Sequence, residues 1–195
     1  CGLTTAPRAE EDNFTGLLRT QRPVSDCQKS FGLSCRDFQL FPPSLQRFCV
    51  MSTVVITGGS RGIGAAAVEL FAARGDRVYF LYAGSHEKAA ALAEKTGAMP
   101  IRCDVADGAA VKAAFDTIAD VDILICNAGL AHYGLMSMMP ESDWDRLFAV
   151  NVKGIYHCVN AAMPAFLRKH SGCVITVSSM WGQVGASCEA AYSAT

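Results

Sequence analysis

Apolar and polar positions alternate in blocks along residues 51–195. Short apolar runs of strand length are separated by longer segments in which apolar residues recur at helical spacing. This alternation is typical of an α/β fold in which a doubly wound parallel sheet carries helices on both faces. The predicted strands are Val54–Thr57, Arg77–Tyr82, Met99–Cys103, Asp122–Cys126 and Cys173–Ser178.

Local signals set the ends of the first helices. A helix is predicted over Ile63–Arg74, where Gly75 stops it. A second helix is predicted to begin at Ser85, a favourable N-cap residue, and to end near Gly97. A third helix is predicted to follow Asp107.

The longest predicted helix extends from about Ser142 to His170, and Gly172 is expected to close it. Pro164 lies in its interior. A proline has no N–H to donate to the helical hydrogen-bond ladder, so a kink is expected there. This helix connects the fourth and fifth predicted strands, as a parallel sheet requires.

Residues 1–50 form an unpatterned leader, because neither a helical nor a strand period persists in them. The leader lacks the apolar core of a secretory signal, and Glu10, Glu11 and Asp12 argue against a transit peptide. We therefore predict that Met51 is the natural start and that residues 1–50 are not native coding sequence. The alternative is a mobile N-terminal arm.

Composition favours a small-molecule or carrier-bound partner. The net charge is -1, so there is no basic surplus to attract nucleic acid or an anionic membrane. An apolar run of about 18 residues, which a membrane span needs, is absent from the sequence. The nine cysteines form no CxxC pair, so we expect reduced thiols in a cytoplasmic protein and no metal. A zinc site would need distant ligands: Cys103, Cys126, Cys158 and Cys173.

Residues 57–64, TGGSRGIG, join the first predicted strand to the first predicted helix. Glycines allow the backbone to turn tightly there, and N–H groups at the start of a helix attract an anion such as a pyrophosphate. Taken alone, such a segment is equally compatible with an ordinary tight turn. Its predicted cofactor-binding residues are Gly58, Ser60, Arg61, Gly62, Ile63 and Gly64.

The spacing Gly-x3-Gly-x-Gly, with CDV at Cys103–Val105 and NAG at Asn127–Gly129, resembles the short-chain dehydrogenase/reductase family. The resemblance covers essentially all of residues 51–195 and implies a Rossmann-like NAD(P)-binding reductase domain. The family sheet has seven strands in the order 3-2-1-4-5-6-7. Five are accounted for in this sequence, so we expect a domain that is incomplete at its C-terminus.

The resemblance also assigns roles outside the glycine-rich loop. It implies that Asp104 and Val105 hold the adenine ring, although Asp104 alone would pass for a strand-end turn residue. Cys126 stands where an asparagine often precedes NAG, and we expect this change to affect packing more than chemistry. The NAG segment is expected to steady the central sheet beside the cofactor through Asn127, Ala128 and Gly129.

Charge at the end of the second predicted strand favours NADPH over NADH. A carboxylate there would hydrogen-bond the NAD ribose and repel the NADP 2′-phosphate, but the first acid after this strand is Glu87. Arg61 and Ser85 are placed to contact a 2′-phosphate. The alternative for Arg61 is a solvated loop cation.

Ser179 and Tyr192, thirteen positions apart, match the catalytic pair of the family. The resemblance implies that Tyr192 donates a proton to the substrate oxygen, that Ser179 hydrogen-bonds this oxygen, and that Asn151 holds a water of the proton relay. Each residue alone also suits a cap or packing role. The family lysine would stand at position 196, after the last residue, so we expect little or no activity from this polypeptide.

Several functions stay open. The segments TGGSRGIG, LYAGSHEKA and NVKG resemble bacterial 3-oxoacyl-acyl carrier protein reductases, whereas SSMWGQVGASCEAAYSA is closer to elongation factor P 5-aminopentanone reductases. In the second case Glu189 could meet a substrate amine, although a solvated loop acid is the simpler explanation. A third hypothesis is that this polypeptide is not an enzyme but a non-catalytic nucleotide-binding fragment. The parent enzyme is expected to be a homotetramer or homodimer.

Overall fold

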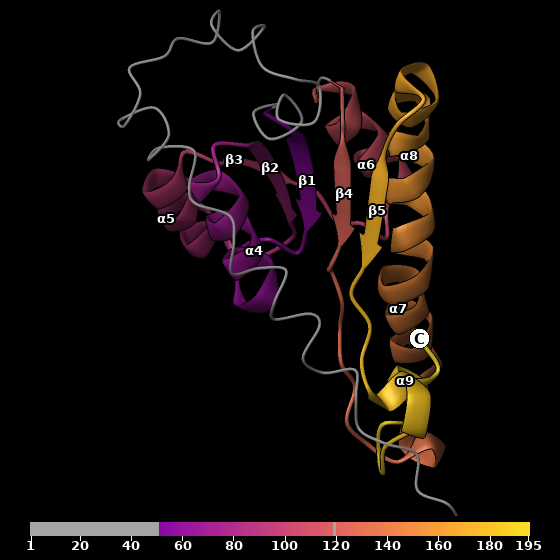
Figure 1. The fold of residues 1–195 in the computed structure, drawn as a ribbon. Helices are drawn as coiled ribbons and strands as arrows, with labels where there is room; N and C mark the ends of the chain where they lie inside the picture. Colours follow the sequence, from indigo (N-terminus) through magenta and orange to yellow (C-terminus); the bar gives the residue numbers. More distant parts are fainter. Residues whose placement is uncertain (1–50, 119) are drawn as a thin grey trace, which may run out of the picture. The chain divides into compact units, whose positions relative to one another are not determined.

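A five-stranded parallel sheet forms the centre of the computed structural model, which describes residues 51–118 and 120–195. The strand order is β3-β2-β1-β4-β5, which confirms the predicted doubly wound sheet (Figure 1). The prediction for residues 1–50 lies outside the described residues. The strands are β1 (Thr53–Thr57), β2 (Arg77–Tyr82), β3 (Met99–Arg102), β4 (Ile123–Cys126) and β5 (Cys173–Thr176).

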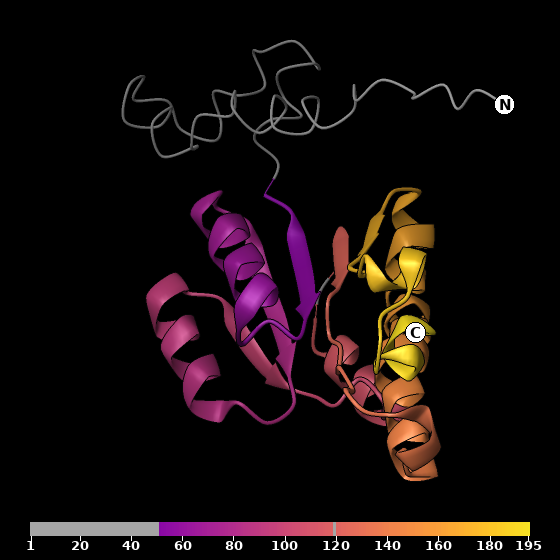
Figure 2. The same cartoon turned by 90° about the horizontal axis from the view of Figure 1, so that it is seen from below.

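Two layers of helices cover the sheet because alternate residues of each strand point to opposite faces. In β1, Val54 and Ile56 pack in the cluster that contains Val68 of α4 (Gly62–Ala73). The intervening Val55 packs in the other cluster, with α6 (Gly108–Asp116) and α8 (Gly154–Lys169). Helix α5 (His86–Thr96) joins α4, and Figure 2 shows the two layers on either side of the strands.

The helix ends mostly follow the predicted local signals. Gly75 and Gly97 adopt positive φ angles of 87° and 73° and terminate α4 and α5. Asp107 caps α6, since its carboxylate accepts hydrogen bonds from the N–H groups of residues 109 and 110 at 2.9 and 3.1 Å. Ser85 occupies the predicted N-cap position of α5, but its hydroxyl makes no capping hydrogen bond to any described residue.

The predicted long helix contains a π-helical turn that the sequence pattern did not indicate. Helix α7 (Glu141–Phe148) leads into the π-helical segment η3 (Ala149–Lys153), which continues directly into α8. Such turns insert one residue into an α-helix and are frequent at functional sites. The predicted end of this helix near His170 agrees with the structure, in which α8 ends at Lys169. The residue that closes the helix is His170, which takes a left-handed conformation (φ 50°), and not Gly172 as predicted.

The strands lead to the same edge of the sheet, where the remaining short elements lie. The segments after β4 and β5 run side by side away from this edge (Figure 1) and are joined by a hydrogen bond from the Gly134 N–H to the Cys188 carbonyl at 2.7 Å. These segments contain η2 (Met136–Met138), α9 (Trp181–Val184) and α10 (Ala190–Ser193). Across residues 51–118 and 120–195, no helix has the length and apolar character needed to span a bilayer.

Candidate functional site

The glycine-rich loop turns sharply between β1 and α4 because three glycines leave room for close backbone approach. Gly58 has a φ of 66°, which favours glycine. A Cβ on Gly59 would lie 2.5 Å from the Phe80 Cβ, so the loop can pass over β2 only without a side chain there. A Cβ on Gly64 would collide with the Gly58 carbonyl oxygen and lie 2.6 Å from the Asn127 Nδ2. Sequence reasoning identified Gly58 and Gly64 and missed Gly59.

The N-terminus of α4 offers its N–H groups to an anion. Arg61, the N-cap residue, makes no side-chain capping bond to described residues, and the first turn of α4 contains no acidic residue. The first N–H groups of a helix have no partner inside it and carry the positive end of the helix dipole. Arg61, Gly62 and Ile63 are exposed beside this helix end, and Ser60 is half-buried. The loop therefore fits a phosphate group.

The NAG segment and the glycine-rich loop form one hydrogen-bonded unit. The Asn127 Nδ2 donates to the carbonyls of Thr57 and Gly58 at 3.0 and 3.2 Å. In return, the Thr57 hydroxyl oxygen accepts hydrogen bonds from the N–H groups of Asn127 and Ala128 at 3.0 and 2.9 Å. Sequence reasoning named the NAG residues, including Gly129, but missed Thr57, which looks like an ordinary strand residue in the pattern.

Asp104 and Val105 follow β3 at the same edge of the sheet. Asp104 accepts hydrogen bonds from the Ala106 N–H at 3.0 Å and from the Arg146 Nη2 at 2.7 Å. Burial alone would raise the pKa of Asp104, but the hydrogen bonds from Arg146 and Ala106 outweigh it, so the pKa of this carboxyl lies below its usual range. Val105 is buried, and its carbonyl accepts a hydrogen bond from the His157 Nδ1 at 2.9 Å.

Asn151 lies in the π-helical turn and is buried, and both its side-chain oxygen and its side-chain nitrogen are hydrogen-bonded. Its Oδ1 accepts from the Leu130 N–H at 2.8 Å, and its Nδ2 donates to the Leu130 carbonyl at 2.9 Å. The Nδ2 also donates to the Thr195 Oγ1 at 2.9 Å, and this hydroxyl donates to the Tyr192 carbonyl at the same distance. Asn151 thus links the segment after β4 to the helix that carries Tyr192. Thr195 was not singled out from the sequence.

The predicted catalytic pair lies on neighbouring short elements beyond β5. Ser179 precedes α9, and its Oγ accepts a hydrogen bond from the Trp181 N–H at 3.3 Å. Tyr192 lies in α10, which packs against α9 and α7. Both side chains are half-buried. The phosphate loop, Asp104 and this pair all come from segments that leave the same strand edge, where ligands bind in open α/β sheets.

The segment after β2 is free of acidic side chains up to the start of α5. Ser85 is half-buried there, and Glu87 is exposed in the first turn of α5. The Tyr82 hydroxyl and the His86 Nδ1 lie 3.5 Å apart. A phosphate group at this position would therefore meet no nearby carboxylate on this segment.

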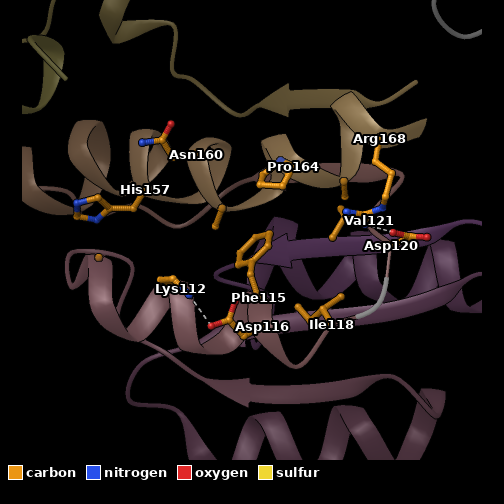
Figure 3. Close-up of a pocket in the computed structure, with 13 residues that line it drawn as sticks. Lys112, Phe115, Asp116, Ile118, Asp120, Val121, His157, Asn160, Pro164 and Arg168 are labelled. Atoms are coloured by element: carbon orange, nitrogen blue, oxygen red, sulfur yellow. Dashed lines mark hydrogen bonds and ion pairs between the residues drawn. The ribbon is translucent and has the colours of Figure 1, made fainter. Parts of the chain in front are cut away.

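A cavity of about 580 Å³ lies elsewhere, between α6 and α8, and contains none of the predicted site residues (Figure 3). Its charged groups pair with one another: Lys112 with Asp116, and Arg168 with Asp120. Phe115 lies between the two helices in this view. These pairings leave the cavity without a free charge to recognise a ligand.

The cysteines of the core are poor candidates for chemistry. Burial raises the pKa of Cys126, and burial with the nearby charges of Asp104 and Asp107 raises that of Cys103, each to about 11. Burial likewise raises the pKa of Cys158. In residues 51–118 and 120–195, no group of three His, Cys, Asp or Glu side chains is arranged to hold a metal ion.

Comparison with known proteins gives the family. A family model described as short chain dehydrogenase matches residues 52–195. The chain belongs to the short-chain dehydrogenase family. The sequence is 38% identical over 152 residues to the 3-oxoacyl-[acyl-carrier-protein] reductase FabG of Staphylococcus aureus, covering 73% of this chain and 62% of that protein. It is 33% identical over 148 residues to YmfI of Bacillus subtilis, an uncharacterized oxidoreductase, covering 72% and 61%.

Solved structures of short-chain dehydrogenases share the fold. One is a short-chain dehydrogenase from Streptomyces avermitilis, with a TM-score of 0.70, 29% identity and coverage of 74% of this chain and 55% of that one. Another is a metagenomic short-chain oxidoreductase in complex with NADP, with a TM-score of 0.70, 31% identity and coverage of 73% and 69%. Family membership and this complex support a nicotinamide cofactor. The chain spans about three fifths of the length of the curated relatives it matches (62%).

Proposed function

We propose that this protein is a reductase that uses NADPH to convert a carbonyl group to an alcohol. The observation that carries the proposal is the unit formed by Thr57, Gly58 and Asn127 at the uncapped N-terminus of α4, because it fits a dinucleotide phosphate. Ser179 and Tyr192 leave the same strand edge. The similarity to FabG supports reduction as the reaction class.

The proposal gives a separate role in proton transfer or substrate binding to each of Tyr192, Ser179 and Asn151. When bound, a reduced nicotinamide would supply the hydride that the carbonyl carbon accepts. Tyr192 donates a proton to the carbonyl oxygen, and the Ser179 hydroxyl hydrogen-bonds that oxygen as negative charge develops on it. Asn151 would hold a relay water through its main chain, since its side chain is already engaged.

NADPH is the preferred cofactor in this proposal. Arg61 is exposed at the phosphate loop and Ser85 lies beyond β2, whereas the acidic residue that would repel a 2′-phosphate is missing from the β2 end. An arginine–phosphate hydrogen bond is charge-assisted, so a preference for NADPH of about tenfold or more is expected. The NADP complex of a relative at 31% identity supports this choice.

The substrate we favour is a 3-oxoacyl group carried on an acyl carrier protein, as the name of the FabG relative states for that protein. A ketone on a modified lysine, as in elongation factor P 5-aminopentanone reductases, is the second candidate. Glu189 supports it: this carboxylate is half-buried in the segment between Ser179 and Tyr192, where a substrate amine could approach. Both substrates require the same hydride and proton transfers.

The test is a comparison of substrates with the enzyme purified from its native source. NADPH oxidation is followed with acetoacetyl thioester and with 5-aminopentanone-modified elongation factor P. Turnover of the thioester alone is expected. Turnover of the modified factor alone would select the second candidate, and turnover of neither would contradict the proposed reductase function. Glu189→Gln is informative here, because it should slow only the amine-bearing substrate.

The alternative outside the enzymes is a protein that binds NADPH without reducing a carbonyl substrate. Saturable NADPH binding with no NADPH oxidation would favour this alternative, and robust NADPH oxidation by the purified chain would exclude it.

Self-association of the protein, as a homodimer or homotetramer, is part of the proposal, as is a cytoplasmic location. Helix α8 supports association because it exposes large apolar side chains at helical spacing. Tyr156 is 61% exposed and Leu167 is 65% exposed, and Met163 lies between them on the same stripe. The negative net charge gives no support for a nucleic-acid or anionic-membrane partner.

A further inference from the structure

The segment after β3 contacts the continuous helix formed by α7, η3 and α8 at more than one point. Arg146 of α7 forms an ion pair with Asp104 at 2.7 Å. Gly154 permits close packing against Val105, because a Cβ at Gly154 would lie 2.7 Å from the Val105 Cγ2. His157 then holds the Val105 carbonyl at 2.9 Å. These contacts with the helix therefore set the orientation of the Asp104 carboxylate.

The proposed cofactor site puts the adenosine half of the dinucleotide near this segment. The phosphates would lie at the N-terminus of α4, next to the end of β1, and the nicotinamide would lie toward Tyr192, beyond β4 and β5. The adenosine must then extend in the other direction, across the ends of β2 and β3. Asp104 follows β3 by two residues, so its carboxylate is the acidic group at that end.

The Asp104 carboxylate keeps acceptor capacity for a ligand. An ionised carboxylate has about four acceptor positions, and described residues donate to it from the Ala106 N–H and the Arg146 guanidinium. Its side chain is 39% exposed. Adenine presents a 6-amino group, a hydrogen-bond donor that suits the remaining acceptor positions.

We propose that Arg146 is a positioning residue for cofactor recognition, which orients the Asp104 carboxylate toward the 6-amino group of adenine. The inference rests on the proposed function and deepens it. Arg146 acts through Asp104: without its guanidinium the carboxylate rotates freely about its remaining bond to Ala106. Recognition of the adenine base then weakens, while the phosphate and nicotinamide contacts are unchanged.

The test compares two ligands on the full 195-residue chain: NADPH and its hypoxanthine analogue, in which a 6-oxo group replaces the 6-amino group. A carboxylate accepts from the amino group and repels the oxo group, so the wild-type chain should bind NADPH about tenfold more tightly. Arg146→Ala should reduce this ratio to roughly threefold or less, and Arg146→Lys, which keeps the charge, should recover part of it. Asp104→Asn should abolish it.

A matched control removes a different exposed ion pair. Lys112→Ala breaks the Lys112–Asp116 pair on α6, whose side chains are 75% and 64% exposed, and should leave the ligand ratio unchanged. If Arg146→Ala weakens both ligands equally, its role is structural and the inference is wrong. If the wild-type chain binds both ligands equally, Asp104 does not read adenine and the inference is also wrong. Failure to bind either dinucleotide would overturn the proposed function itself.

Discussion

Gly64→Ala tests the role of the glycine-rich loop, because the added methyl group would disturb this loop more than the rest of the fold. A methyl group at this position would collide with the Gly58 carbonyl oxygen, and it would lie 2.9 Å from the Gly58 carbonyl carbon and 2.6 Å from the Asn127 Nδ2. The backbone of Gly58 cannot rotate away like a side chain. The turn must therefore open, and the hydrogen bond from Asn127 to the Gly58 carbonyl, now 3.2 Å, must lengthen.

The expected magnitude follows from these contacts. Overpacking costs about 1–3 kcal/mol, and a lost hydrogen bond adds about 0.5–1.5 kcal/mol. Alanine recovers roughly 0.5–1 kcal/mol relative to glycine inside a helix. The free energy of unfolding should fall by about 2–3 kcal/mol, which corresponds to a decrease in Tm of roughly 5–10 °C for a domain of this size. NADPH affinity should fall at least about tenfold, because the loop N–H groups no longer converge on the phosphate.

The assay combines thermal unfolding with NADPH titration, followed by the fluorescence of the nicotinamide. Gly75→Ala is the matched control, since it lies at the other end of α4 with a φ of 87°, and the added Cβ would meet no heavy atom within 4 Å among the described residues beyond its own local backbone. It should lower stability by about 1–2 kcal/mol through backbone strain alone and leave NADPH affinity unchanged. Wild-type NADPH affinity in Gly64→Ala would refute the assignment of this loop to phosphate binding.

Three further outcomes follow from the structure. Thr57→Val removes the oxygen that accepts hydrogen bonds from two N–H groups of the NAG segment at 3.0 and 2.9 Å, so the free energy of unfolding should fall by about 2–4 kcal/mol. Thr57→Ser, which keeps the oxygen, should recover this stability. An unchanged Tm in Thr57→Val would contradict the expectation. Alkylation by iodoacetamide at pH 8, mapped by mass spectrometry, should be at least about tenfold faster at the exposed Cys173 than at Cys158, because burial shields the Cys158 thiol and raises its pKa. Equal rates would show that reagent reaches the core around Cys158. The double variant Tyr156→Glu and Leu167→Glu should dissociate the proposed oligomer in sedimentation velocity, whereas an unchanged assembly would exclude this face of α8 as the interface.

The sheet and its glycine-rich loop could be predicted from the sequence because their signals are local. Apolar runs such as Arg77–Tyr82 coincide with the observed strand, and Gly75 and Gly97 end helices by their backbone conformation. The family resemblance supplied the strand order that the structure confirms. The assignments of Ser179, Tyr192 and the other site residues to a function remain predictions.

Residues that act through long-range contacts could not be predicted in the same way. Thr57 meets the NAG segment 70 positions away, and Arg146 reaches Asp104 across 42 positions. Neither residue differs in the sequence pattern from an ordinary strand threonine or an exposed helical arginine. The π-helical turn was missed because it inserts a single residue between α7 and α8. Each of these two helices keeps its own helical apolar pattern, so the insertion leaves no clear signal in the sequence.

Titration of the purified 195-residue chain with NADPH and with NADH is the decisive test of an NADP site at the carboxyl edge of the sheet. We expect saturable binding of one NADPH per chain, about tenfold or more tighter than NADH because Arg61 and Ser85 contact the 2′-phosphate. Arg61→Ala should bring the two affinities together without weakening NADH. Absence of saturable binding would exclude a dinucleotide site at this edge, and equal affinity for NADH in the wild-type chain would exclude its preference for NADP.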